Sequence, residues 1–221
     1  MTYAFDTDSL SCYNEKKKCR VILQNPPKET AKLKRIIPLL TVLLLFLTAC
    51  GSGEYRSGLH HAEIDVKDYG TISVELDADT APISVENFCE LAEDGFYNGL
   101  TFHRIISGFM IQGGDPNGDG SGGSDQTIHG EFSSNGTENN ISHVRGTISM
   151  ARSDDYNSAS SQFFIVHQDT PSLDGLYAAF GHVTDGMDVV DAICENTPVE
   201  DSNGTVAWWN QPIISEIRII D

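Results

Sequence analysis

The sequence predicts a mainly β domain, either a barrel or a sandwich, that also carries two α-helices. Three observations lead to this prediction. Short apolar segments recur from about residue 62 to the C-terminus, glycine-rich turns separate them, and only two stretches show helical periodicity. The chain after position 50 is long enough to bury a hydrophobic core of its own.

A hairpin and then a helix are expected at the start of this domain. In "AEIDVKDYGTISVEL", residues 62–76, apolar and polar residues alternate on both sides of "KDYG". The following "DTAPISVENFCELAEDG" is expected to be helical, with Asp79 or Thr80 as its cap, Pro82 in its first turn and Gly95 after its end. Helical spacing places five apolar residues on one face: Val85, Phe88, Cys89, Leu91 and Ala92.

Further short strands and one more helix are expected along the rest of the chain. The strands are predicted at residues 101–106, 110–112, 146–151, 162–166, 178–183 and 212–220. The helix is predicted at about 187–195, where Val189, Val190 and Ile193 recur at helical spacing. This number of strands and helices favours a barrel or sandwich over an α/β fold.

The first fifty residues differ from the rest and are expected to be a leader. They hold eight of the fourteen Lys and Arg residues but only four of the thirty-two Asp and Glu residues. The apolar run "IIPLLTVLLLFL" follows this basic region and is too short to span a bilayer. It ends in "LTAC", which resembles a bacterial lipoprotein signal with Cys50 as the lipidated residue. We expect a leader over 1–49, a lipidated Cys50 with a flexible tether over 50–62, and one domain over 63–221.

Charge and cysteine content exclude two other classes of protein. The net charge of −18 repels phosphates, so a DNA- or RNA-binding protein is excluded. Outside the leader and Cys50, the chain has only Cys89 and Cys194, and their spacing indicates no disulfide framework. Both lie on the apolar sides of predicted helices, which favours buried free thiols.

Four segments together resemble the cyclophilin family of peptidyl-prolyl isomerases. They are "FHRIISGFMIQGGD", "GTISMAR", "SASSQFFI" and "LDGLYAAFGHV", and their order and spacing match the family over roughly residues 62–221. The resemblance implies a closed eight-stranded antiparallel β-barrel capped by two α-helices. It also implies a protein that acts on proline-containing polypeptides without a cofactor. The histidines lack the spacing of metal ligands, so no metal is expected. A barrel without a long exposed edge gives no reason to expect more than a monomer. The membrane would be reached only through the lipid on Cys50.

The resemblance assigns a role to one arginine in an otherwise apolar strand. Arg104 takes the position of the catalytic arginine, which stabilises the twisted amide of an X–Pro bond. Gln112 takes the position of a polar contact to the substrate backbone. The proline pocket and its flanks would be formed by Phe109, Met110, Ala151, Gln162, Phe164, Leu173 and Tyr177. Apolar residues in strands more often fill a core, so the role of these residues rests on the resemblance.

The chain departs from the family pattern at positions near this site. Ser172 stands where many members have a tryptophan, which leaves cyclosporin sensitivity open. Tyr177 replaces a histidine and is still expected to line the pocket and donate a hydrogen bond. Arg152 stands in place of an asparagine, and Ser107 replaces a common proline. Arg152 and Ser172 keep open an alternative function, a proline-peptide-binding chaperone or scaffold with little catalysis.

Two further features have less specific interpretations. The loop that starts at Asp115, "DPNGDGSGGSDQ", begins like a calcium loop but has Gln126 where the bidentate glutamate is needed. A calcium site is therefore not expected. Trp208 and Trp209 are adjacent and would face opposite ways in a strand. One is expected in the core, and the other is expected to cover the end of the barrel or to contact a partner.

Overall fold

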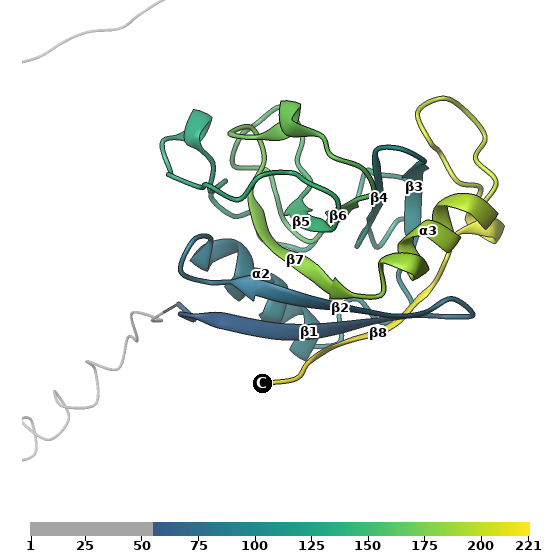
Figure 1. The fold of residues 1–221 in the computed structure, drawn as a ribbon, viewed down its shortest axis with the longest axis horizontal. Coiled ribbons are helices and arrows are strands. Elements are labelled where there is room, and N and C mark those ends of the chain that lie inside the picture. The colour runs from purple at the N-terminus through teal and green to yellow at the C-terminus, as the bar shows by residue number, and fades with distance from the viewer. Residues whose placement is uncertain (1–54) are drawn as a thin grey trace, which may run out of the picture. The chain divides into compact units, whose positions relative to one another are not determined.

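The structure is a computed structural model that describes residues 55–221, so the leader, the signal segment and Cys50 lie outside the described residues and stay predictions. Every expected helix and strand within residues 55–221 is present, with ends shifted by a few residues (Figure 1). The elements are β1 (Leu59–Val66), β2 (Gly70–Asp77), α2 (Pro82–Glu93), β3 (Phe102–Ile106), β4 (Met110–Gly113), η2 (Ser133–Asn135), β5 (Thr147–Met150), β6 (Phe163–Val166), η3 (Pro171–Leu173), β7 (Ala179–Asp185), α3 (Met187–Asn196), η4 (Trp208–Asn210) and β8 (Ile214–Ile219). Within residues 55–221, no helix combines the length and apolar character needed to cross a bilayer.

The eight strands form one curled antiparallel sheet in the order β3-β4-β6-β5-β7-β2-β1-β8. The expected closed barrel is not confirmed, because no ladder joins the two edge strands β3 and β8. The start of β8 approaches the residues that lead into β3, through an isolated bridge between Thr101 and Ile213. Three backbone hydrogen bonds accompany it, from the Gly99 N–H to the Ile214 carbonyl (2.8 Å), from the Ile214 N–H to the Leu100 carbonyl (2.8 Å) and from the Phe102 N–H to the Pro212 carbonyl (2.9 Å). The sheet is thus a half-barrel whose two edges are hydrogen-bonded over a short stretch, residues 99–102 and 212–214, without a ladder between β3 and β8.

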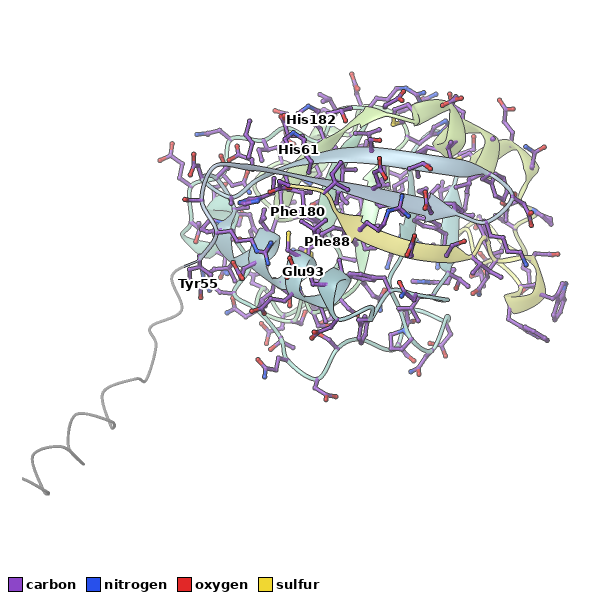
Figure 2. The ribbon with its side chains drawn as sticks, turned by 90° about the horizontal axis from the view of Figure 1, so that it is seen from below. Tyr55, His61, Phe88, Glu93, Phe180 and His182 are labelled. Carbon is purple, nitrogen blue, oxygen red and sulfur yellow. The ribbon has the colours of Figure 1, made fainter. Side chains whose placement is uncertain are left out.

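The core fills the concave side of this sheet and is closed by α2. Phe88 of α2 is fully buried, and Figure 2 labels it together with Phe180 of β7. The Phe88 ring lies 5.3 Å from the Phe180 ring, 5.4 Å from Phe163 and 5.3 Å from Tyr97, between centroids. Aromatic pairs at these distances add to the stabilisation that their buried area provides. The apolar face predicted for this helix is therefore the face that contacts the core, except that Leu91 is only partly buried.

The free backbone N–H groups at the N-terminus of α2 donate to a residue that the sequence did not indicate. Ala81 is the N-cap and makes no side-chain cap hydrogen bond, so the expected cap at Asp79 or Thr80 is wrong. The carboxylate of Glu131, which is buried, accepts from the N–H of Ile83 (3.0 Å) and of Ser84 (2.8 Å). An anion at this end of a helix is stabilised by the helix dipole. A distant loop thus caps the helix and is fixed to it.

The folded region starts before the expected boundary at residue 63. β1 begins at Leu59 and pairs with β2 along its whole length, from Leu59 opposite Asp77 onward. Arg56 also belongs to the fold, because its Nη2 lies 2.8 Å from Glu93 Oε2 on α2. This hydrogen bond to Glu93 raises the pKa of Arg56. The last residues assigned to the tether are therefore part of the sheet and its contacts.

Both helix thiols are buried, as their position on apolar faces predicted. Cys89 lies in α2 and Cys194 in α3, and both are free cysteines in the structure. Burial raises the pKa of Cys89 to about 12 and that of Cys194 to about 11. These raised pKa values keep both thiols protonated at neutral pH, whereas the thiolate is the reactive form. Both side chains therefore act as small apolar residues of the core.

The prediction for the tandem tryptophans is wrong for one of the two. Neither is in the core: Trp208 is 77% exposed and Trp209 is 67% exposed. They lie in the short helix η4 rather than in a strand, so the alternation expected of a strand does not apply. Their rings contact each other edge to face, at 5.8 Å between centroids.

Candidate functional site

A second apolar cluster lies on the face of the sheet opposite to the core. Adjacent residues of the same strand go to different faces, so Phe163 and Ile165 of β6 are in the core while Phe164 and Val166 are in the second cluster. Met110 and Ala151 complete its buried part, and Phe109, Leu173 and Tyr177 pack on it as partly buried residues. This explains why consecutive residues of β4 and β6 are apolar, since a strand that is covered on both faces buries both sets of its side chains.

A β-bulge places Arg104 on this second face. The pairing of β3 with β4 shifts register between Phe102 and Arg104, which leaves His103 as the extra residue. Without the bulge, Phe102 and Arg104 would point to the same face, since side chains alternate along a strand. With it, Phe102 and Ile105 are in the core, and Arg104 lies opposite Gln112 of β4. Bulges commonly re-aim a side chain beside a site.

The Arg104 guanidinium is held by neutral acceptors on both sides. Its Nη1 donates to Gln112 Oε1 (3.2 Å), and its Nε donates to the Asn203 carbonyl (2.8 Å). A third contact joins Nη2 to Asn203 Oδ1 (3.3 Å). Of the five N–H donors of a guanidinium, two remain free for a ligand. Burial lowers the pKa of Arg104, but an arginine stays charged at neutral pH.

Hydrogen bonds extend from Arg104 across the floor of the site. Gln112 Nε2 donates to Gln162 Oε1 (2.9 Å), and Gln162 Nε2 donates to the carbonyls of Gly122 (2.7 Å) and Gly120 (3.1 Å). The glycine-rich loop is thereby fixed to the strands. The loop is also closed internally, because the buried Asp115 carboxylate accepts from the backbone N–H of Asn117 (2.8 Å) and of Gly120.

These residues line one hollow of about 420 Å³, open mouth included. Most of the side chains assigned to the site by resemblance surround it: Arg104, Phe109, Met110, Gln112, Ala151, Phe164, Leu173 and Tyr177. Gln162 does not line this hollow and instead lines the neighbouring one, on the far side of Gln112. An apolar floor with a cation and an amide at its rim suits a small apolar ring attached to a polar backbone. The role of each residue stays a prediction.

Arg152, one of the departures from the family pattern, lies at the mouth of the same hollow. Its guanidinium carbon is 4.6 Å from the ring centre of Tyr177, 4.8 Å from Tyr156 and 5.3 Å from Phe132. Two of its nitrogens donate to the Leu176 carbonyl, at 2.8 and 3.1 Å. The charge is thus held by aromatic faces and a carbonyl, and Arg152 forms a fixed wall of the hollow.

A buried histidine that sequence reasoning did not select supports the pocket from behind. The His143 ring stacks on Phe164 at 5.9 Å and 18° between planes. Its Nδ1 is 2.9 Å from Asp174 Oδ1, and its Nε2 is 3.0 Å from Ser149 Oγ. This order of carboxylate, imidazole and hydroxyl is that of a nucleophilic triad. Ser149 is fully buried in β5, however, so no substrate reaches its oxygen and the arrangement is structural.

We predict that the stability of the protein falls as the pH drops below about 6.5, the ordinary pKa of histidine. Burial lowers the pKa of His143, and burial also lowers the pKa of His103. The folded state therefore favours the neutral rings, and the unfolded state binds more protons in this range. The contribution of the two neutral histidines to stability is fully present above the ordinary histidine pKa. It is lost as the pH falls toward their lower pKa values in the folded state.

Urea unfolding of the full chain at pH 7.5 and pH 5.5 measures this effect. The free energy of unfolding should be lower at pH 5.5, and the difference between the two pH values should be smaller in His143→Gln. His129→Gln, at an exposed histidine that forms no ion pair within residues 55–221, should leave the difference unchanged. An equal pH dependence in the parent and His143→Gln would contradict the prediction.

Comparison with known proteins links this geometry to one family. The family model for cyclophilin type peptidyl-prolyl cis-trans isomerases matches residues 61–220. Peptidyl-prolyl cis-trans isomerase B of Bacillus subtilis is 46% identical over 124 residues, which cover 56% of this chain and 82% of that protein. Peptidyl-prolyl cis-trans isomerase-like 2 of Rhizopus delemar is 44% identical over 140 residues, which cover 62% of this chain. The matched part is only 25% of that fungal protein.

Among solved structures, a cyclophilin type peptidyl-prolyl cis-trans isomerase of Cryptosporidium parvum is similar over most of its length. Its crystal structure in the presence of the dipeptide Ala-Pro superposes with a TM-score of 0.64 at 32% sequence identity. The superposition covers 73% of this chain and 99% of that one. The likeness in sequence and the likeness in fold therefore concern the same domain.

Proposed function

The chain belongs to the cyclophilin family of peptidyl-prolyl cis-trans isomerases, and on this premise we propose that it accelerates rotation about X–Pro bonds in proteins that fold outside the cytoplasm. One observation carries the proposal: a fixed guanidinium lies at the rim of an apolar hollow of the right kind for a proline ring. The Cryptosporidium structure, determined in the presence of Ala-Pro, supports a proline-containing substrate.

The proposed mechanism needs only binding that is stronger at the transition state. Rotation about an X–Pro bond is slow because it breaks amide resonance. In the twisted state the proline nitrogen becomes pyramidal and gains a lone pair, to which a fixed N–H of Arg104 donates. Neither planar ground state offers that lone pair, so the contact lowers the barrier. Reaching milliseconds from tens of seconds takes about 4 decades, or roughly 5–6 kcal/mol.

The other residues of the site hold the substrate while the bond rotates. Met110 and Phe164 form the buried floor for the proline ring, with Phe109 and Leu173 at its sides. The Gln112 side chain, held between Arg104 and Gln162, offers an amide to the substrate backbone. Because these acceptors and donors are already fixed, little reorganisation is needed at the moment of rotation.

The alternative function is a binding module that holds proline peptides with little catalysis. The observation that favours it is the fixed Arg152 side chain, which lines the hollow and lies over the Tyr177 ring. Exchange between cis and trans peptide by the full chain decides between the two functions. Acceleration of a short X–Pro peptide supports the isomerase, and binding without acceleration supports the module.

We place the protein outside the cytoplasm, anchored to the membrane through Cys50. This part of the proposal rests on the basic leader, the apolar run and "LTAC", all of which lie outside the described residues. Two or more acyl chains give stable anchoring, since each buried methylene contributes about 0.8 kcal/mol.

The lipidation is tested by growing a bacterial host that expresses the full chain with an alkyne-labelled fatty acid. The parent should carry the label, and Cys50→Ala should lose it completely, because a lipoprotein signal provides one acceptor thiol. Cys19→Ala, in the leader that would be removed, should keep it. Label that survives in Cys50→Ala would contradict the assignment.

A further inference from the structure

Two exposed tryptophans lie next to the proposed proline pocket and have no part in the mechanism above. Trp208 and Trp209 are 77% and 67% exposed, although large aromatic side chains are usually buried. The segment that carries them, between α3 and β8, runs beside β3 (Figure 1). Exposed aromatic residues that gather at one place are typical of a contact surface.

The two tryptophans form one wall of a groove of about 940 Å³, open mouth included, here called the tryptophan groove. The glycine-rich loop around Asp119 forms the opposite wall, and Arg104 and Gln112 line both this groove and the proline hollow. Gln211 joins the walls, because its Nε2 donates to the Gly118 carbonyl (2.8 Å) and to the Val206 carbonyl (3.0 Å). The groove is therefore preformed and continuous with the proposed substrate site.

The charged residues that line the groove carry a net negative charge. Asp119 and Glu200 line it, and neither forms an ion pair within residues 55–221. Arg104 lies in the same lining and is hydrogen-bonded to the neutral Asn203 and Gln112, so it keeps its positive charge and the lining has a formal charge of −1. The groove thus combines two carboxylates with aromatic faces, which is an environment that attracts a cation.

A buried histidine in the groove lining has no hydrogen-bond partner. His103, the bulge residue, is only 4% exposed, and both of its ring nitrogens are unpaired within the described chain. Burial lowers the pKa of His103, so the ring is neutral near pH 7 and one nitrogen offers a lone pair. Buried polar atoms are nearly always paired, so an acceptor left free in a groove indicates a ligand with N–H donors.

We propose that the tryptophan groove binds a lysine or arginine side chain of the same polypeptide whose proline occupies the pocket. The tryptophan faces and the two carboxylates attract the positive charge, and the neutral His103 accepts one of its N–H donors. An acidic side chain would be repelled by the two carboxylates, and an uncharged one would leave their negative charge unpaired. The inference rests on the proposed function and adds a residue preference to it.

The test uses peptides with a central Ala-Pro and one variable residue, placed at each position up to four residues from the proline. Lysine is compared with norleucine, which has a similar apolar chain without the charge, and with glutamate. Dissociation constants of the full chain are measured by fluorescence anisotropy at low and high salt. At one position or two adjacent ones, lysine should bind about five- to tenfold more tightly than norleucine. Added salt should reduce this ratio.

Variants then locate the effect in the groove. The affinity for the lysine peptide divided by that for the norleucine peptide should approach one in two double variants. One combines Trp208→Ala with Trp209→Ala, and the other combines Asp119→Asn with Glu200→Gln. A matched pair of exposed carboxylates elsewhere, Glu90→Gln with Glu195→Gln, should keep the ratio. Phe109→Ala should weaken both peptides by the same factor, because it acts at the proline pocket.

Several results would overturn the inference. Norleucine or glutamate binding as tightly as lysine at every position would do so, as would a lysine preference that survives the groove variants. If the parent accelerates uncharged X–Pro peptides but shows no lysine preference, only this inference fails. If the parent binds none of the peptides, the proposed function fails first, and the inference falls with it.

Discussion

Replacing Arg104 by alanine is expected to lower kcat/KM for X–Pro isomerisation by about two decades or more, or ~2.7 kcal/mol of transition-state stabilisation. The change removes the donor that would contact the proline nitrogen only in the twisted state, so kcat should fall more than affinity. The apolar floor of the hollow, formed by Met110 and Phe164, stays in place. A protease-coupled assay on a short X–Pro peptide measures the effect.

Two further variants serve as controls. One tests whether a positive charge without the guanidinium is enough for activity, and the other tests whether the loss of an arginine elsewhere lowers activity. Arg104→Lys keeps the charge but not the planar fork held by Gln112 and Asn203, so most of the activity should still be lost. Arg145→Ala removes an exposed arginine that pairs with Asp191 away from the hollow, and should leave kcat/KM unchanged. Activity of a folded Arg104→Ala close to that of the parent would contradict the mechanism.

Replacing Phe88 by alanine is expected to lower the free energy of unfolding by about 3–5 kcal/mol. The ring is fully buried and contacts three other aromatic rings, so its removal leaves a cavity that rigid neighbours cannot fill. The thermal midpoint should drop by roughly 10 °C or more. Urea unfolding of the full chain measures the free energy directly.

The control for this prediction lies on the same helix. Glu90 is exposed, so Glu90→Ala should change the free energy of unfolding by no more than about 0.5 kcal/mol. A loss of less than about 1 kcal/mol in Phe88→Ala would show that α2 does not hold the core in the way described.

Local patterns were sufficient to predict the helices and strands of the domain. The hairpin of β1 and β2 has strict alternation, and α2 has a proline in its first turn and one apolar face. These signals depend only on residues close in the sequence. The cap of α2 could not be predicted in the same way, because Glu131 is nearly fifty residues from Ser84, the residue whose N–H it accepts from (|i−j| = 47).

The closure of the sheet and the place of the tryptophans also depend on distant parts of the chain. Whether β3 and β8 pair is decided by the curvature of the whole sheet, which no single strand encodes. Trp208 and Trp209 were expected in a strand, where one of them would be buried. A short 3-10 helix instead exposes both rings, and nothing in the neighbouring residues indicated it.

The candidate site came from the resemblance rather than from residue patterns. Phe163 and Phe164 are adjacent and chemically identical, yet one is in the core and the other in the pocket. The bulge at His103, which turns Arg104 toward the pocket, has no sequence signal of its own. Asn203 precedes a glycine, a pair that indicates only a turn, although its carbonyl accepts from Arg104 in the structure. Such partners become visible only when the strands are folded together.

The central claim is that this chain catalyses rotation about X–Pro bonds rather than merely binding proline, and NMR exchange spectroscopy tests it most directly. A short X–Pro peptide is mixed with the full chain, and both binding shifts and cis–trans exchange rates are read from the same sample. The account predicts exchange in milliseconds with the parent, against tens of seconds in the free peptide. Binding shifts without faster exchange, from a folded parent, would contradict the account and identify the protein as a proline-peptide-binding module.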